Sequence, residues 1–258
     1  MPEGDTIHYA ANRMRPVLEG REPEEIVTPQ RRHAKDRWPE RLAGRAVSAV
    51  DAHGKHLFLH FEGDLVLHSH LRMTGVWATY ERARRWGRSP RRAWLVLRTP
   101  SHEIVEFDGP VLELLTESRA RFDRRLAALG PDVLADEFDA DRFLRRLRAD
   151  DPTRLFGDAL LDQRTIAGIG NLWKAESCWE AGVSPWRRTR DVSDDEALAV
   201  VAAARPRMLA ASVHGHPDRD QRVYGRAGRP CGRCGARIRA RGQGDDNRRT
   251  FWCGRCQR

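Results

Sequence analysis

The sequence predicts an α+β chain with a β-rich first half, a helical middle and a small cysteine-bearing module at its C-terminal end. Three observations predict this order. Short apolar or alternating runs, separated by Gly, Pro or polar residues, recur over residues 47–107, which is the pattern of strands joined by short connections. Helical spacing of apolar residues replaces this pattern after Leu112. Four of the five cysteines stand at or beyond position 231, in two closely spaced pairs.

The first half is expected to begin with an amphipathic helix over residues 5–18, because apolar residues recur there at helical spacing. Asp5 can cap this helix, and Pro16 weakens its second half. Residues 21–45 are rich in proline and charge, and they are expected to form loops. Five strands are then expected, over residues 47–52, 55–61, 64–70, 94–98 and 103–107.

The helical middle centres on a glycine turn. Gly168 and Gly170 permit a sharp turn that exposes backbone N–H groups, and Asn171 then opens a helix as its expected cap. Such a helix start suits a phosphate, although the same residues also fit a simple helix–turn–helix packing turn. Ser193 and Glu196 form a capping box for the last helix, which should run to about residue 211. The other helices are expected over residues 123–129, 141–148, 155–161 and 172–181.

The net charge is confined to the C-terminal module. The chain carries 46 Lys+Arg against 37 Asp+Glu, a formal +9, and residues 219–258 alone contain 12 Arg and three Asp. A basic module on a neutral body indicates an anionic polymer as partner, although a solvated arginine-rich surface is the alternative. No apolar run is long enough to span a membrane, so no membrane partner is expected. The first residues lack the features of a secretory signal, so a cytoplasmic protein is expected.

The cysteine pairs are the most specific motif. Cys231 and Cys234 are followed, after 18 intervening residues, by Cys253 and Cys256. Two such pairs can place four thiolates around one structural Zn²⁺ on a β-hairpin. A redox motif would not need the second pair, and unliganded reduced cysteines are the remaining alternative. Residues 247–252 are expected to form the return strand of this hairpin, whose arginines can reach a phosphate or a groove.

Three further residues suggest covalent chemistry or proton transfer. Removal of Met1 would leave Pro2 with a secondary amine that is partly neutral at pH 7 and can attack an aldehyde-like carbon. Glu3 beside it could supply a proton. Lys55, between two expected strands, is one of only three lysines in this arginine-rich chain. Because lysine can release a proton and arginine in practice cannot, Lys55 is a candidate for proton transfer or a phosphate contact, with chance retention as the alternative.

These features occur together and in this order in one known family. The chain resembles the Fpg/Nei DNA glycosylases, most closely the bacterial endonuclease VIII (Nei) branch. The resemblance implies an N-terminal β-sandwich with a helix over residues 1–117, a helical domain with a helix–two-turn–helix over residues 118–218, and a zinc-finger module over residues 219–258. The matching stretches are residues 2–5, 54–58, 69–75, 129–132, 160–171 and 223 onward through the cysteine module.

The resemblance also implies an activity: a bifunctional DNA glycosylase and AP lyase of base excision repair. The partner would be double-stranded DNA with damaged bases or abasic sites, and the enzyme would be a cytoplasmic, nucleoid-associated monomer holding one Zn²⁺. Pro2 would attack C1′ of the damaged nucleotide while Glu3 protonates the sugar ring oxygen. Lys55 and Arg248 match the positions assigned to β- and δ-elimination. Arg248 is preferred to its neighbour Arg249 because it lies five residues before Cys253.

Three more matched residues would contact DNA. Asn171 matches a phosphate contact, and Arg72 and Met73 match the loop that fills the void left by a flipped base. The Arg-Arg-Phe run of typical Fpg proteins is missing after Asp108, where Gly109 follows. This departure favours the Nei branch and hence oxidised pyrimidines as substrates. An arginine that precedes the Gly-Pro-Asp motif in some relatives is also absent. The alternatives are Fpg-like excision of oxidised purines, or a non-catalytic zinc-dependent protein that binds damaged DNA.

Overall fold

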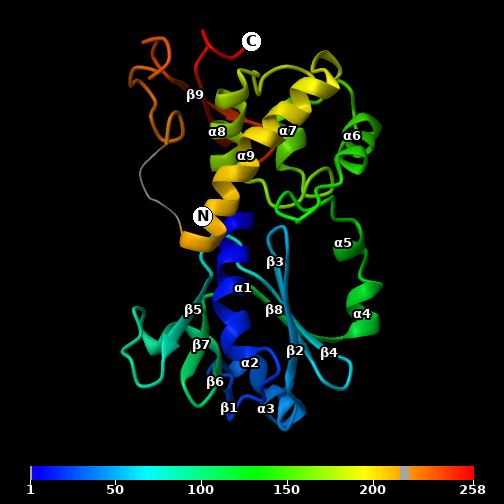
Figure 1. Cartoon of the computed structure of the whole chain (residues 1–258), viewed down its shortest axis with the longest axis vertical. Helices are drawn as coiled ribbons and strands as arrows, with labels where there is room; N and C mark the ends of the chain where they lie inside the picture. The colour runs from blue at the N-terminus through cyan, green and yellow to red at the C-terminus, as the bar shows by residue number, and fades with distance from the viewer. Residues whose placement is uncertain (1, 216–220) are drawn as a thin grey trace. The chain divides into compact units, whose positions relative to one another are not determined.

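The structure is a computed structural model that describes residues 2–215 and 221–258 (Figure 1). The chain separates into two compact units, Met1–Ala127 and Ala128–Arg258. Strands dominate the first unit, whereas the second contains helices and a two-stranded hairpin. The predicted α+β class is therefore confirmed. The further division of the second unit into a helical domain and a zinc module stays a prediction.

The first unit is a β-sandwich. Its described strands form two antiparallel sheets, in the orders β2-β3-β4-β8 and β1-β6-β7-β5. Buried side chains of both sheets, among them Leu59 and Leu67 from one and Leu95 and Ile104 from the other, belong to a single core. The strands are β1 (Glu25–Val27), β2 (Val47–His53), β3 (His56–Phe61), β4 (Leu65–His70), β5 (Val76–Glu81), β6 (Ala93–Arg98), β7 (His102–Phe107) and β8 (Val111–Thr116).

Helix α1 (Gly4–Leu18) packs against β2, β3 and β5 (Figure 1). Its buried face includes Ile7 and Met14, and burying each such side chain contributes roughly 1.5–3 kcal/mol. Pro16 lies inside the helix without ending it. The predicted cap is wrong, because Glu3 is the N-cap and forms a capping box with Thr6. Asp5 instead stands in the first turn.

Two other predictions for this unit need correction. Residues 21–45 are not only loops, because they include β1, α2 (Arg31–Ala34) and α3 (Trp38–Leu42). The strands do not end at Leu112, because β8 pairs with β4 from Val111 to Thr116, and β5 was not expected at all. These strands depend on partners far away in the sequence, which local patterns do not reveal. After η1 (Pro90–Arg92) and the last strands, the unit ends with α4 (Glu117–Arg121) and α5 (Arg124–Ala127), two short helices where one was expected.

The second unit is built on helices α8 and α9, which pack side by side. Ser193 and Glu196 form the predicted capping box of α9, which continues through Pro206 to His214. Gly170, not Asn171, is the N-cap of α8, so Asn171 is the first residue inside the helix. The elements are α6 (Ala140–Ala149), α7 (Phe156–Leu161), α8 (Asn171–Ala181), η2 (Thr189–Asp191), α9 (Asp194–His214), β9 (Arg239–Gln243) and β10 (Arg248–Trp252).

A separate apolar cluster attaches the hairpin of β9 and β10 to α8. It includes Ala175 and Trp179 of α8, Ile238 just before β9, Phe251 of β10 and Cys253 just after it. The hairpin is in register from Arg248 opposite Gln243 to Trp252 opposite Arg239, as expected for a return strand over residues 247–252. The end of the hairpin away from its tip is therefore attached to α8. Among the described residues, no helix is both long and apolar enough to cross a membrane.

Candidate functional site

The start of the first unit holds a carboxyl group in a fixed place. Glu3 is only 2% exposed and stands at the positive end of α1, and the half-buried Pro2 precedes it directly. The Glu3 backbone N–H donates to the Thr6 hydroxyl at 3.4 Å, and the Glu3 carbonyl accepts from the Thr6 N–H at 3.0 Å. The helix start therefore fixes the position of the nitrogen of Pro2 and of the acid next to it.

Lys55 lies in the tight turn between β2 and β3. His53 pairs with His56 across this turn, so Gly54 and Lys55 alone form its loop. Gly54 has a φ of 57° and Lys55 does not have a positive φ, which is the pattern of a type II′ hairpin turn. The turn therefore presents the Lys55 side chain at the end of the sheet, half-buried.

Two histidines with a lowered pKa, His56 next to Lys55 in the sequence and His70 of β4, belong to the neighbourhood of this turn. Burial, together with the charges of Arg72 and Lys55, lowers the pKa of His70 to about 4. Burial and the neighbouring histidines lower the pKa of His56 to about 2, and His56 Nδ1 lies 2.8 Å from Nε2 of the buried His68. At neutral pH the His56 and His70 rings are therefore uncharged, and Lys55 and Arg72 are the cations that act on His70. His56 belongs to the motif of residues 54–56, but the sequence alone assigned it no role.

Arg72 and Met73 occupy a tight loop between β4 and β5. The loop closes through a hydrogen bond from the Gly75 N–H to the Leu71 carbonyl at 2.9 Å. Arg72 has a φ of 49° and Met73 is 64% exposed. The fold therefore presents two long side chains to solvent on a short loop. Asp108 is the residue after which the Arg-Arg-Phe run of Fpg proteins is missing. Its backbone carbonyl accepts a hydrogen bond from the hydroxyl of Thr74 in this loop, at 3.3 Å.

Asn171 is 6% exposed and holds the hairpin strand β10. Its Nδ2 donates to the Arg249 carbonyl at 2.9 Å, and its Oδ1 has no hydrogen-bond partner within the described residues. One turn later on α8, Lys174 is fully buried and its Nζ donates to the Thr250 hydroxyl at 2.5 Å and to Gln243 Oε1 at 3.3 Å. Lys174 was missed as a site residue, although it is another of the three lysines.

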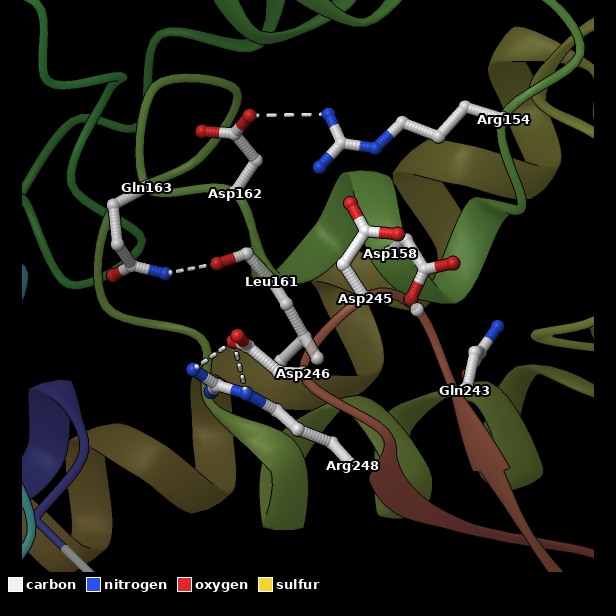
Figure 2. A pocket seen from close by; sticks show the side chains of 10 residues that line it. Arg154, Asp158, Leu161, Asp162, Gln163, Gln243, Asp245, Asp246 and Arg248 are labelled. Carbon is white, nitrogen blue, oxygen red and sulfur yellow. Dashed lines mark hydrogen bonds and ion pairs between the residues drawn. The ribbon is translucent and has the colours of Figure 1, made fainter.

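Arg248 is the first residue of β10, at the tip of the hairpin. Its guanidinium is 40% exposed, and Nη2 and Nε lie 2.9 and 3.1 Å from Asp246 Oδ2. Both side chains line a polar pocket of about 450 Å³ (Figure 2). Arg249, the rival arginine, is more exposed and its guanidinium lies over the Phe251 ring at 5.9 Å. The two arginines thus differ in direction as well as in position.

The four sequence-predicted cysteines converge on one point, hereafter called the cysteine cluster. Their sulfur atoms all lie within 4.8 Å of one another, and the pairs Cys231–Cys256 and Cys234–Cys253 are 3.9 and 3.5 Å apart. Bonds of about 2.3 Å to a tetrahedral Zn²⁺ require sulfur separations of about 3.8 Å. The two measured pairs are close to this separation, so the cluster can hold a metal ion of this size.

The surroundings of the cluster also suit thiolate ligands. The Trp179 indole N–H lies 3.3 Å from Cys231 Sγ. Burial raises the pKa of Cys231, but this hydrogen bond and backbone N–H groups outweigh it and lower the pKa to about 6. Burial and the neighbouring sulfurs raise the pKa of Cys256 to about 12, so a cation is needed before all four can ionise. By contrast, Cys178 is fully buried and its pKa is raised to about 12, as expected of a structural thiol.

The fold matches that of DNA glycosylases of known structure. The Fpg (MutM) protein of Lactococcus lactis, solved in a complex with DNA containing N7-benzyl-Fapy-dG, superposes with a TM-score of 0.83 over 100% of both chains, at 22% identity. Its complex with DNA containing an abasic site gives the same score at 21% identity. A β-sandwich led by a helix, followed by helices and a cysteine hairpin, is thus the formamidopyrimidine-DNA glycosylase fold.

Sequence comparisons establish the family. The N-terminal domain of formamidopyrimidine-DNA glycosylases matches residues 1–119, and the H2TH domain of the same proteins matches residues 129–218. A "Probable endonuclease 8 2" of Streptomyces coelicolor is 39% identical over 100% of this chain and 94% of its own. The "DNA-(apurinic or apyrimidinic site) lyase Nei2" of Mycolicibacterium smegmatis is 35% identical over 100% and 99%. The chain belongs to the Fpg/Nei family of DNA glycosylases, and the resemblance found in its motifs is confirmed.

Proposed function

We propose that this protein is a bifunctional DNA glycosylase and AP lyase of base excision repair. One observation carries the proposal: a buried carboxyl group, Glu3, stands at the start of α1 directly after Pro2. A nitrogen nucleophile and a proton donor in adjacent, fixed positions are what a Schiff-base glycosylase needs. Family membership and relatives named as endonuclease 8 and as an AP lyase support the same activity.

In the proposed reaction, the secondary amine of Pro2, freed by removal of Met1, attacks C1′ of the damaged nucleotide. Glu3 donates a proton to the sugar ring oxygen, the ring opens, and the base leaves. An iminium ion, in which Pro2 nitrogen is bonded to C1′, remains. Proton donation by a positioned carboxyl group accelerates such a step by about 10²–10⁴-fold. The pairing of amine and acid thus explains why both residues stand together at a helix start.

The remaining predicted residues have proposed roles in cleavage and positioning. Lys55 serves the β-elimination that expels the 3′ phosphate, because its side chain acts on His70, whose lowered pKa leaves that ring uncharged and unable to compete for an anion. Arg248 serves the δ-elimination that expels the 5′ phosphate. Arg72 and Met73, exposed on the loop after β4, fill the void left by the extruded base. Asn171 contacts a DNA phosphate in addition to holding β10.

The metal in the cysteine cluster is proposed to be one structural Zn²⁺. A ligand set of four thiolates in a closed tetrahedral arrangement favours Zn²⁺, and the sulfur separations fit it. The ion supplies folding free energy to a hairpin module with a small core of its own. Through β10, it fixes the strand that carries Arg248.

Borohydride trapping tests the covalent step. Wild-type protein beginning at Pro2 is incubated with duplex DNA that contains an abasic site, and sodium borohydride reduces any iminium to a stable adduct. We expect an adduct with the mass of protein plus DNA. An N-terminal extension that keeps the Pro2 nitrogen in a peptide bond should abolish it, and Pro2→Gly should retain part of it because a primary amine remains. Lys35→Arg, at an exposed lysine elsewhere, is the matched control and should trap like wild type. Absence of any adduct would refute the lyase proposal and favour a non-catalytic DNA-binding protein.

Substrate preference needs its own test. We propose oxidised pyrimidines, since the Arg-Arg-Phe run of Fpg proteins is absent after Asp108 and several relatives are named endonuclease 8. Duplexes carrying an oxidised pyrimidine or 8-oxoguanine opposite cytosine are compared under single-turnover conditions. Glu3→Gln should lose base excision on every duplex while still trapping preformed abasic sites. Faster excision of 8-oxoguanine than of every pyrimidine lesion would overturn the preference.

A further inference from the structure

The hairpin tip is acidic in an otherwise basic module. Asp245 and Asp246 stand in the loop between β9 and β10, and both line the pocket that contains Arg248 (Figure 2). Asp158 and Asp162 line the same pocket, so four aspartates face two arginines there. Burial raises the pKa of Asp158, and the neighbouring Asp245 adds to this effect. The pocket is therefore negative in a chain whose net charge is +9.

The strands of the hairpin are held firmly as far as Gln243, so the loop beyond it decides where Arg248 points. Gln243, opposite Arg248 in the register, accepts from the Thr250 hydroxyl at 2.7 Å and donates to the Pro185 carbonyl at 2.8 Å. Lys174 contacts both Gln243 and Thr250 from α8. These buried contacts stop one residue short of the tip. Beyond them, Asp246 is the side chain that engages the guanidinium of Arg248.

We propose that Asp246 restrains Arg248 and thereby slows δ-elimination relative to β-elimination. This inference rests on the proposed function, in which Arg248 serves the second elimination. Nε and Nη2 of Arg248 both donate to Asp246 Oδ2, so a DNA phosphate must displace this carboxylate to reach the same two donors. A carboxylate beside the phosphate also repels it. Asp246 is thus a positioning residue that acts through Arg248.

The step that it slows can be written in full. After β-elimination, the sugar remnant is an unsaturated iminium bonded to Pro2 and still carries the 5′ phosphate. A proton leaves C4′ for water, and its electron pair enters the conjugated system. The C5′–O bond then breaks, and the phosphate leaves with the bonding electrons. Negative charge grows on this phosphate, so a guanidinium already paired with Asp246 stabilises it less than a guanidinium without that pair.

Product analysis after cleavage of an abasic-site duplex tests the proposal. Gel electrophoresis separates the β product, which ends in an unsaturated aldehyde, from the δ product, which ends in a 3′ phosphate. Exposed ion pairs of this kind shift an equilibrium by about 1.4- to 5-fold. We therefore expect Asp246→Asn to raise the rate of the second elimination by about 1.4- to 5-fold, with the first elimination unchanged. The gain should shrink as salt increases, because Asp246 is 72% exposed.

Two controls separate the contact from general charge removal. Asp245→Asn removes the same charge from the same loop but from a side chain that is not bonded to Arg248, so it should have a smaller effect. In an Arg248→Ala background, Asp246→Asn should have no effect at all. An unchanged or lower δ-to-β ratio in Asp246→Asn, with cleavage intact, would overturn this inference alone. Absence of cleavage and of trapping in the wild type would overturn the proposed function instead.

Discussion

A buried carboxylate on α8 gives the sharpest stability prediction. Glu176 is fully buried and accepts from three consecutive backbone N–H groups, those of Arg222, Val223 and Tyr224, at 2.8–2.9 Å. Arg207 of α9 donates to the same carboxylate at 3.2 Å. One side chain thus fixes the chain segment that leads into the cysteine module to both central helices.

Replacing Glu176 with Gln keeps the shape but turns one oxygen into a donor. Each carboxylate oxygen faces two donors: Oε1 faces the N–H groups of Val223 and Tyr224, and Oε2 faces those of Arg222 and Arg207. Either rotamer of the amide therefore loses two hydrogen bonds to a charged group, each contributing about 1.5–3 kcal/mol. The expected loss of about 3–5 kcal/mol agrees with that for breaking a buried ion pair. At about 3 °C per kcal/mol, the Tm of this unit should fall by roughly 10 °C.

The assay is thermal unfolding followed by circular dichroism, with hydrogen exchange at residues 222–224 as a local readout. Glu180→Gln is the matched control, because Glu180 lies one turn further along α8, is 52% exposed and faces Arg233 at 3.6 Å. An exposed pair of this kind contributes at most about 1 kcal/mol. A drop of less than about 3 °C for Glu176→Gln, or unchanged exchange at residues 222–224, would refute the reasoning.

Three further predictions concern thiols, pH and salt. In the presence of a chelator, the thiols of the cysteine cluster should react with Ellman's reagent, whereas Cys178 should react only on unfolding, because burial raises its pKa to about 12. The pKa of His56 and of His70 lies below the value in the unfolded chain, so the unfolded chain binds protons first as the pH falls. The free energy of unfolding should therefore be at its full value above about pH 6.5 and decrease as the pH falls towards 4. Tm measured against pH checks this, and His56→Asn should make Tm depend less on pH. Arg233 is held by the Trp179 carbonyl, so Arg233→Ala should leave the salt dependence of DNA binding unchanged. Loss of an arginine that contacts a phosphate would instead reduce the slope of log binding constant against log salt concentration by about 0.9.

Local patterns predicted most of the elements and the cysteine cluster. The capping box at Ser193 and the spacing of the cysteines each depend on residues close in sequence, so their geometry follows from the motif. Strands β5 and β8 were missed because each pairs with a strand that is not its neighbour in the sequence. Strand β5 pairs with β7, and β8 pairs with β4, so a local pattern does not reveal either pair. The cap of α1 was misplaced because Asp is a favoured N-cap residue and Glu is not, whereas here Glu3 and Thr6 form a capping box.

The chemistry of single side chains was harder to predict than their places. Asn171 was correctly expected at the start of a helix, but its hydrogen bond to the Arg249 carbonyl requires the hairpin to lie against α8. The same packing buries Lys174, whose retention in an arginine-rich chain was visible in the sequence while its partner, Thr250, was not. The pairing of Arg248 with Asp246 depends on the conformation of a four-residue loop, which spacing alone does not determine.

The arginines of the cysteine module show that composition can indicate an anionic partner but cannot give the number of arginines that contact it. Arg233 donates to the Trp179 carbonyl at 3.0 Å and lies 4.2 Å from the centre of its ring, so it closes the module onto α8. Arg237 donates to the Gly228 carbonyl at 3.0 Å, within the module itself. Arg248 is paired with Asp246. Because N–H donors of these arginines are already engaged by carbonyls or a carboxylate, the module offers DNA fewer unengaged guanidinium groups than its twelve arginines suggest. Under the proposed function, the arginines that reach DNA are those whose present partners a phosphate can displace, and the exposed pair of Arg248 with Asp246 is one such case.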